Sequence, residues 1–493
     1  MENKVCDLRS AIELLKTLPG QYFETDAEAD PVYEIPGVHR RIGCLGTVIR
    51  PTKEGPALVF NNVKGYPGTR LTIGMLASRK RVGHLLDCKP DRLGHLLRDS
   101  VANPVPPILV GKEKAVCQEV VHMADDPDFD IRKLLPGTKV TTDDAGQYIT
   151  MGLCRASDPD TGISDVTIHR MCIQGDKRDE ITFWSAPGAR HIGGFFDKME
   201  RQGKALPISI SIGLDPAVYI GSCFLSPTTP EGYDELGVAG AIRKAPVEVV
   251  PCLTIPETAI ANAEFVIEGE ILPNRRVMED NVSGLGMAMP EFPGYNGVAI
   301  NACVLKIKAI THRKDPIWQT CVGASEEHVS MAGITTEACI LDMVEKSMPG
   351  RLLNVYSHPS GGGKYLVILQ FKKNMPSDEG RQRQAALLAF CSFIELKHVI
   401  VVDEDVDLFD TTDVLWAMNT RFQGDLDAVT IPGVRCHLAD PSADKDYNPY
   451  IRSHGISCKT IFDCTVPYDL KKDFRFIRAK FEDVDLKKFG LED

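Results

Sequence analysis

Apolar residues recur with two different periods along this chain, with helical spacing near both ends and strand-like alternation in the middle. Residues 7–18 form an amphipathic stripe that predicts a helix, in which Ser10 and Glu13 fit an N-terminal capping box. Further helices are expected at 79–86 and 92–101, and strands at 57–60 and 70–74. The first part of the chain therefore predicts an α/β unit that ends near the proline-rich segment 103–107.

Short alternating segments, separated by glycine and proline, dominate the middle of the chain. The expected strands are 148–155, 164–173, 180–185, 207–213, 247–254, 264–271, 302–312 and 317–322. One helix is predicted between them, at 193–202. Many short strands with this punctuation indicate an antiparallel barrel that closes on itself.

The last third returns to an alternation of helix and strand. A strand at 365–371, a long helix at 378–396 and a buried strand at 399–402 predict one βαβ unit with a right-handed crossover. We therefore expect a mixed α+β and α/β multidomain protein. The expected domains are an N-terminal α/β domain at 1–115, a barrel at 116–322 and a C-terminal α/β domain at 323–493.

The composition of the 493 residues is that of an ordinary globular enzyme with an acidic surface. The formal net charge of −12 argues against nucleic acid and anionic membranes as partners, because both repel an acidic protein. The 15 cysteines show no C-x-x-C or zinc-finger spacing, which predicts reduced thiols. We find neither a signal-peptide core nor a membrane-spanning apolar run, and we expect a cytoplasmic protein.

The first candidate site lies on the predicted strand 164–173. Strict alternation places Asp165 and His169 on one face of this strand and Arg170 on the other. A bulge, a twist or a site that wraps around a strand end is therefore needed to bring Asp165 and Arg170 into one pocket. The alternative is an edge strand whose charges are solvated.

Two further segments supply ligand types that hard divalent cations accept. His191 precedes a glycine pair at a predicted helix start, and Glu235 opens a helix of small residues, where the helix dipole favours an anion. With Asp165 they form an oxygen–nitrogen–oxygen set suited to Mn²⁺ or Mg²⁺. The alternatives are a structural histidine and a carboxylate that only caps its helix, and the sequence leaves both open.

A third group of candidates consists of one acid and three basic side chains. Glu291 lies between two prolines in a glycine turn, where burial beside aromatic rings would raise its pKa toward that of a proton donor. Lys364 follows three glycines in a loop that fails the Walker pattern, so we expect a charged contact in a cleft. The alternatives are a surface turn for Glu291 and ordinary loop or helix-end histidines for His328 and His437.

The order of these strings resembles the motif series of the UbiD family of decarboxylases, over nearly the whole chain. The series is Asp165-x4-Arg170, His191-Ile192-Gly193-Gly194, Glu235-x3-Ala239-Gly240 and Pro290-Glu291. The strings SDVTIHRM, GARHIGG, GYDELGVAGAIR, MPEFPGY, SEEHVSMAG and GGGK are similar to the branch that acts on protocatechuate and gallate. The resemblance implies a UbiD-like fold, in which a central split β-barrel binds a flavin between α/β domains and the last domain ends in an oligomerisation tail.

The resemblance also implies the cofactors. They are prenylated flavin mononucleotide, Mn²⁺ or Mg²⁺ bridging its phosphate to the protein, and K⁺ nearby. Asp165, His191 and Glu235 match the metal-ligand positions, although the family usually has Asn in place of Asp165. The further expected cofactor contacts are Thr167, Ile168, His169, Arg170, Arg190 and Lys397, and K⁺ is expected near Val166, Ser222, Cys223 and Glu235.

The catalytic residues are likewise implied by the resemblance. Arg170 matches the family's catalytic arginine and Glu291 its catalytic acid. Many relatives carry a second acid five residues after that glutamate, where this chain has Asn296, so the acid–arginine–acid network is either incomplete or completed from elsewhere. The residues expected to recognise ring hydroxyls are Lys364, His328 and His437.

The function implied is the reversible, non-oxidative decarboxylation of a hydroxylated aromatic acid through a covalent adduct with the prenylated flavin. The expected reactions are protocatechuate to catechol and gallate to pyrogallol. The alternatives are another phenolic, indole or pyrrole acid within the family, and a flavin reductase or a non-catalytic flavin-binding subunit outside it. The resemblance also implies a flavin prenyltransferase as supplier of the cofactor, and a homodimer or hexamer.

Overall fold

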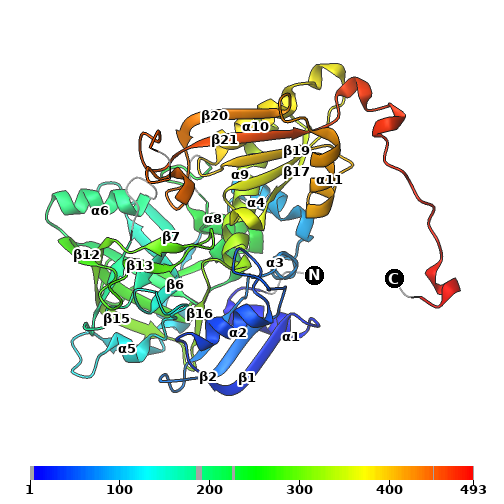
Figure 1. Ribbon diagram of the computed structural model, residues 1–493. Helices are drawn as coiled ribbons and strands as arrows, with labels where there is room; N and C mark the ends of the chain where they lie inside the picture. Colours follow the sequence, from blue (N-terminus) through cyan, green and yellow to red (C-terminus); the bar gives the residue numbers. More distant parts are fainter. Residues whose placement is uncertain (1–4, 185–190, 225–227, 448, 492–493) are drawn as a thin grey trace.

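Three main sheets follow one another along the chain in the order α/β, barrel, α/β, as expected (Figure 1). The structure, a computed structural model, describes residues 5–184, 191–224, 228–447 and 449–491. Among these residues there is no helix whose length and apolar character would let it span a membrane.

The N-terminal part is a four-stranded sheet with its helices. The strands are β1 (Tyr22–Ala29), β2 (Ala57–Val63), β3 (Arg70–Ile73) and β16 (Ile317–Thr320), and the helices are α1 (Leu8–Lys16), α2 (Glu34–Gly43), α3 (Arg79–Leu85) and α4 (Leu93–Ala102). The prediction that 317–322 belongs to the barrel is wrong, because β16 pairs in parallel with β3. The capping box of α1 is formed by Asp7 and Ser10 rather than by Ser10 and Glu13, because the helix already begins at Leu8.

The middle of the chain forms a seven-stranded sheet that curls into a barrel. Its strands are β5 (Val120–Met123), β15 (Asn301–His312), β12 (Phe265–Met278), β9 (Leu206–Ile212), β6 (Tyr148–Ser157), β7 (Ser164–Cys172) and β8 (Glu180–Phe183). β8 pairs with β15, and a bridge joins its Ile181 to Ile173 just beyond β7, which brings the two ends of the sheet together. Helix α6 (His191–Arg201) packs against β6 and β12.

Several smaller elements lie around the barrel. They are α5 (Ile131–Leu134), α7 (Pro216–Gly221), α8 (Glu235–Arg243), the hairpin of β13 (Met287–Pro290) and β14 (Asn296–Val298), and a sheet of β4 (Ile108–Leu109), β10 (Glu248–Pro251) and β11 (Thr258–Ile260). The segment 247–254 is therefore a strand but not a barrel strand, because β10 pairs with β4 and β11.

The C-terminal part is a five-stranded sheet with three helices. Its strands are β17 (Leu352–Ser357), β18 (Leu366–Phe371), β19 (His398–Val402), β21 (Ile456–Cys464) and β20 (Ala428–Arg435), and its helices are α9 (Glu326–Ser347), α10 (Arg381–Ser392) and α11 (Thr411–Arg421). β18, α10 and β19 form the predicted βαβ unit. α10 is shorter than predicted, because Gly380 is left-handed at its start and Phe393 is extended at its end.

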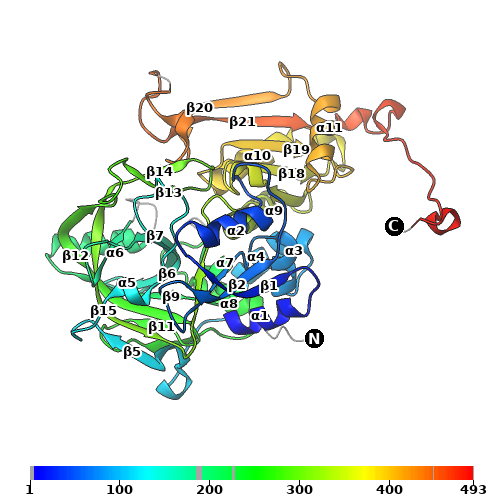
Figure 2. The ribbon, with the colours of Figure 1, turned by 60° about the horizontal axis from the view of Figure 1, so that its bottom comes forward.

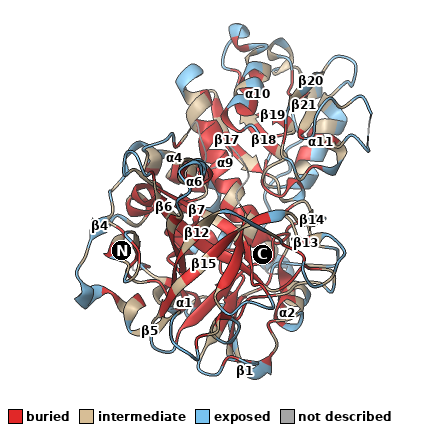
Figure 3. Ribbon diagram, turned by 90° about the vertical axis from the view of Figure 1, so that its left-hand side faces the viewer, coloured by how far each residue is buried: buried red, intermediate tan, exposed pale blue. Residues whose placement is uncertain are grey.

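Most barrel strands and the long helix α9 are buried, whereas exposed residues gather in the loops (Figure 3). α9 packs against α4, α10 and β17, so it connects the N-terminal and C-terminal parts. Because α9 starts directly after β16, the loop between them places the end of the N-terminal sheet beside the C-terminal domain.

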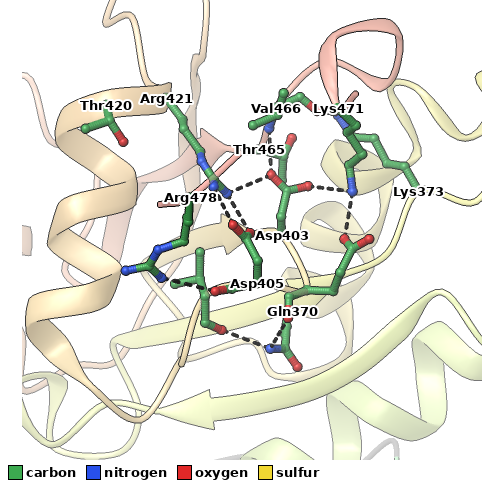
Figure 4. Close-up of polar contacts among 12 residues, drawn as sticks. Gln370, Lys373, Asp403, Asp405, Thr420, Arg421, Thr465, Val466, Lys471 and Arg478 are labelled. Atoms are coloured by element: carbon green, nitrogen blue, oxygen red, sulfur yellow. Dashed lines mark hydrogen bonds and ion pairs between the residues drawn. The ribbon is translucent and has the colours of Figure 1, made fainter. Parts of the chain in front are cut away.

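Beyond β21 the chain leaves the body as an extended arm, residues 471–491 (Figures 1 and 2). Ion pairs hold its start: Lys471 Nζ lies 3.0 Å from Asp403 Oδ1, and Arg421 Nη1 lies 3.1 Å from the other oxygen of the same carboxylate (Figure 4). Arg478 Nη2 lies 2.7 Å from Asp413 Oδ1. The exposed large apolar side chains of the arm are Phe474, Ile477, Phe481, Val484, Phe489 and Leu491.

Candidate active site

Strand β7 carries both Asp165 and Arg170, and an irregularity in the neighbouring strand lies opposite Arg170. Between Ile149 and Gly152, β6 has one residue more than the paired stretch of β7. Such a bulge increases the local twist and redirects side chains. A bulge was one of the alternatives by which Asp165 and Arg170 could reach one pocket, and the structure has one opposite Arg170.

Arg170 is held between two glutamates. Its Nε and Nη2 lie 3.2 and 3.0 Å from the two carboxylate oxygens of Glu279, and its Nη1 donates to Glu291 Oε1. The Tyr148 hydroxyl also donates to Glu279, at 3.0 Å. Burial lowers the pKa of Arg170, but the charges of Glu291 and Glu279 more than offset this and leave the pKa above its ordinary value. The guanidinium therefore stays charged between two acids.

Glu279 completes the acid–arginine–acid network, and sequence reasoning missed it. It follows directly after β12, whereas Asn296 is exposed in β14, with its side-chain nitrogen 3.3 Å from the sulfur of Met287. The available signal was the pair Glu279-Asp280 after a strand pattern. That signal alone does not distinguish a buried acid from one that is solvated at a strand end.

Glu291 lies at the tip of the β13–β14 hairpin. Its N–H donates to the carbonyl of Tyr295 at 2.8 Å, which closes the turn. A Cβ at Gly297 would lie 2.9 Å from Glu291 Cγ and 3.0 Å from Arg170 Nη1, so a glycine leaves room for this ion pair. The side chain of Glu291 is 24% exposed and that of Glu279 is 0% exposed. Glu291 is therefore the acid of the pair that a ligand can reach.

The three predicted metal ligands lie at the start of β7, α6 and α8. His191 Nδ1 lies 3.4 Å from Asp165 Oδ1, and this hydrogen bond raises the pKa of His191 above its ordinary value. Burial, and then the negative charge of Asp165, raise the pKa of Glu235 to about 8. Within the described ranges, no three His, Cys, Asp or Glu side chains are gathered closely enough to hold a metal ion.

The chemistry of this set nevertheless fits a divalent cation. Glu235 Oε2 is buried without a hydrogen-bond partner, and the charge of Asp165 disfavours the charged form of Glu235. A cation between the two carboxylates would remove both costs, and oxygen and imidazole ligands suit Mn²⁺ and Mg²⁺.

The other predicted cofactor contacts have different surroundings. The buried hydroxyl of Thr167 has no hydrogen-bond partner, whereas Nδ1 of the buried His169 lies 2.9 Å from the carbonyl oxygen of Trp184. Ile168 is only half-buried and points away from Thr167, as expected on a strand. Arg190 lies outside the described residues.

Lys397 and the residues predicted around K⁺ lie in other contacts. Lys397 Nζ lies 2.7 Å from Asp440 Oδ2, so it already has a counter-ion in this structure. Val166 is buried, and the Ser222 hydroxyl donates to the carbonyl of Tyr219 at 3.0 Å. Cys223 is half-buried, with its sulfur 3.2 Å from the same carbonyl.

The three residues predicted to recognise ring hydroxyls converge on Phe292, which follows Glu291. The His328 ring stacks on Phe292 at a centroid distance of 5.6 Å, and the His437 ring meets it edge-on at 4.8 Å. Lys364 Nζ lies 4.9 Å from the same ring centroid. Burial, followed by the charge of Lys364, lowers the pKa of His328 to about 4, so this imidazole is neutral at pH 7. An acid and three polar groups are thus brought together around one aromatic residue.

Three family models cover the chain in the same order as its sheets. The N-terminal, Rift-related and C-terminal domains of 3-octaprenyl-4-hydroxybenzoate carboxy-lyase match residues 13–101, 108–326 and 329–464. Together with the barrel and the glutamate–arginine–glutamate site, these matches define a carboxy-lyase. The chain belongs to the UbiD family.

Relatives of known function are similar over almost the whole chain. The gallate decarboxylase of Lactiplantibacillus plantarum is 51% identical, with 98% of both chains covered. The apo structure of 3,4-dihydroxybenzoic acid decarboxylase from Enterobacter cloacae is 55% identical, with a TM-score of 0.93 and 98% and 99% of the two chains covered. The UbiD-class enzyme HmfF from Pelotomaculum thermopropionicum, solved as an evolved dimeric form with prFMN, is 31% identical, with a TM-score of 0.82 and coverage of 98% and 99%.

Proposed function

We propose that this protein removes the carboxyl group of a hydroxylated aromatic acid without oxidation, converting protocatechuate to catechol or gallate to pyrogallol. The observation that carries the proposal is the convergence of Lys364, His328 and His437 on Phe292, the residue after Glu291. This arrangement puts groups that bind phenolic hydroxyls beside an accessible acid. The similarity to a gallate and a 3,4-dihydroxybenzoic acid decarboxylase supports the substrate class.

The reaction needs an electron sink, which prenylated flavin mononucleotide supplies when it is bound. Asp165, His191 and Glu235 would hold Mn²⁺ or Mg²⁺, whose positive charge would offset the negative charge of the flavin phosphate, and the unpartnered oxygens of Thr167 and Glu235 support this assignment. K⁺ would bind near Val166, Ser222 and Cys223. A flavin prenyltransferase would supply the cofactor.

The protein's own contribution is charge and a proton. Arg170 would orient the substrate carboxylate with its guanidinium, which two hydrogen bonds to Glu279 hold in place. Glu291, which pairs with Arg170 in this structure, would take up a proton from solvent and deliver it to the ring carbon after the carboxylate has left as carbon dioxide. The partial exposure of Glu291 allows this proton uptake.

The test is a panel of aromatic acids given to protein co-expressed with a flavin prenyltransferase, with carbon dioxide release as the readout. We expect turnover of 3,4-dihydroxybenzoate or gallate but not of benzoate. Lys364→Ala should lower kcat/KM about 10- to 100-fold while the flavin stays bound, because a charged hydrogen bond to the substrate is lost. Lys372→Ala, which removes an exposed lysine just after β18, is the matched control and should be neutral. Equal activity on benzoate would contradict the proposal.

The oligomer is proposed from the arm. Residues 471–491 carry large apolar side chains outside the body of the chain, and such side chains are normally covered by a partner. We infer that the arm packs against a second copy of the chain in a homodimer or in a hexamer built from dimers. The C-terminal domain, 323–493, would thus end in an oligomerisation tail, after domains at 1–115 and 116–322.

A further inference from the structure

Glu395 bridges two of the residues that surround Phe292. It lies in the turn between α10 and β19. Its Oε2 is 3.0 Å from Lys364 Nζ, and its Oε1 is 3.6 Å from His437 Nε2. The side chains of Glu395 and His437 are 20% and 21% exposed, and that of Lys364 is 13% exposed, so water screens these contacts only in part.

A buried lysine fixes the backbone of this turn through hydrogen bonds to its carbonyls. Lys459, on β21, is 5% exposed, and its Nζ donates to the carbonyl of Ile394 at 2.8 Å and to the carbonyl of Leu396. The thiol of Cys436 lies 3.6 Å from the carbonyl oxygen of Glu395 itself. The carbonyls of Ile394, Glu395 and Leu396 therefore all have polar partners, so the backbone that carries the Glu395 carboxylate is fixed in place.

Removing the charge of Glu395 has a definite physical consequence. His437 Nδ1 accepts the N–H of Ala439 at 2.9 Å, so its Nε2 is the nitrogen that donates toward Glu395. Without the carboxylate, the Lys364 ammonium and this Nε2–H would be two donors beside Phe292 with no negative charge between them. An ammonium group without its counter-ion also gains by turning toward water or toward another acid. Glu291 is an acid whose charge acts on the same cluster, since Lys364 and Glu291 both influence the pKa of His328. Lys364 would thus lose its fixed position for a substrate hydroxyl.

We propose that Glu395 is a positioning residue for hydroxyl recognition, which holds Lys364 and His437 on the two oxygens of its carboxylate beside Phe292. This inference rests on the proposed function, because it assigns Glu395 to the same substrate site. Glu395 acts through Lys364 and His437. Its loss should therefore weaken binding of the dihydroxylated ring more than it slows the chemical step.

The test is Glu395→Gln, which keeps the shape and removes the charge, measured in the flavin-loaded holoenzyme. For 3,4-dihydroxybenzoate we expect KM to rise about 10-fold or more while kcat changes less than about 3-fold. Asp425→Asn removes an exposed carboxylate of the same domain and should leave both constants unchanged. Glu395→Asp restores the charge and should recover part of the lost affinity.

Calorimetric titration of the holoenzyme with catechol and with phenol gives a readout that needs no turnover. The native protein should bind catechol more tightly than phenol, and Glu395→Gln should reduce that ratio about 10-fold. An unchanged ratio and an unchanged KM in a folded Glu395→Gln variant would overturn the role of Glu395 alone. A native protein that releases no carbon dioxide from any hydroxybenzoate would instead overturn the proposed function.

Discussion

Arg170 binds two glutamates whose surroundings give them different roles. Glu279 is fully buried and is fixed by Tyr148 and by the N–H of Ile300, at 3.0 and 3.3 Å. Glu291 is partly exposed at a hairpin tip. An acid that delivers a proton must exchange it with solvent and reach the substrate, which Glu279 is too enclosed to do. We therefore assign orientation of the guanidinium to Glu279 and proton delivery to Glu291.

A substitution at Gly297 tests how closely the spacing between Glu291 and Arg170 must be kept. Gly297→Ala places a methyl group 2.9 Å from Glu291 Cγ, so the acid or the guanidinium must move. We expect kcat to fall about 10²-fold with little change in flavin content, because a displacement near 1 Å at reacting groups costs about that much. Steady-state kinetics on 3,4-dihydroxybenzoate measure the effect.

The control for Gly297→Ala is Gly175→Ala, since an added Cβ at Gly175 meets nothing within 4 Å. Native kcat in Gly297→Ala would show that the ion pair tolerates displacement and that its spacing is not critical.

At this scale the sequence identifies residues that stand in recognisable strings. Arg170, Glu291 and Lys364 were found in this way. Glu279 and Glu395 were not, because each follows or precedes an ordinary strand and gains its role only from partners more than 30 positions away along the chain. Local patterns carry no information on such partners.

The start of helix α9 is an element in which buried acids accumulate. Glu327 accepts hydrogen bonds from the N–H groups of Gly74 and Leu76, at 2.8 and 3.0 Å, which ties α9 to the N-terminal part. Glu326 is 7% exposed, and its Oε2 has no hydrogen-bond partner. Burial raises the pKa of Glu326 to about 7, although the charge of Arg79 opposes this.

This pKa predicts a pH-dependent stability. The pKa of Glu326 in the folded protein lies above the ordinary 4.5. The stability that the protonated Glu326 contributes to the folded state is therefore fully present below about pH 4.5 and is lost as the pH rises through about 7. Glu326→Gln, which mimics the protonated acid, should therefore raise the free energy of unfolding at pH 8 by on the order of 1 kcal/mol and the melting temperature by a few degrees. At pH 5 both increases should be much smaller.

Thermal melts of both proteins from pH 5 to pH 8 measure this difference. A variant that is equally destabilised at every pH would show that Glu326 contributes through shape or hydrogen bonding rather than through its charge.

The periodicity of the sequence predicted most elements but not every pairing. The strand patterns at 247–254 and 317–322 are real, yet β10 and β16 join other sheets because their partners, β4 and β3, come from far earlier in the chain. The alternation on β7 indicated that an irregularity would be needed to bring Asp165 and Arg170 into one pocket, and β6 has a bulge opposite Arg170. The sequence could not show that the bulge lies in β6, because a bulge depends on how two strands pair.

At the scale of the whole molecule, the arm of residues 471–491 lies outside the domains, and its large apolar side chains are exposed. The ion pairs of Lys471 and Arg478 fix where it begins, and the guanidinium of Arg478 also lies 4.0 Å from the Trp416 ring centroid (Figure 4 shows Lys471 and Arg478). Truncation after residue 479 keeps these anchors together with Phe474 and Ile477, and removes Phe481, Val484, Phe489 and Leu491.

We expect the truncated protein to have a smaller assembly mass and a nearly unchanged fold. Light scattering coupled to size-exclusion chromatography measures the mass, and circular dichroism checks the fold. Replacing Lys480 by Ala in the full-length chain is the control, because it removes an exposed charge of the arm and keeps its apolar residues. An unchanged mass after truncation would mean that the arm does not hold the assembly together.

The central claim is that Glu291 protonates the ring carbon from which carbon dioxide departs. The most direct measurement is turnover of 3,4-dihydroxybenzoate in D₂O by flavin-loaded protein, with mass and NMR analysis of the catechol. The account predicts one deuterium per product, at the carbon that carried the carboxylate, and a fall in kcat of about 10²–10⁴-fold in Glu291→Gln with flavin retained. Native turnover by Glu291→Gln, or product without deuterium at that carbon, would contradict the account.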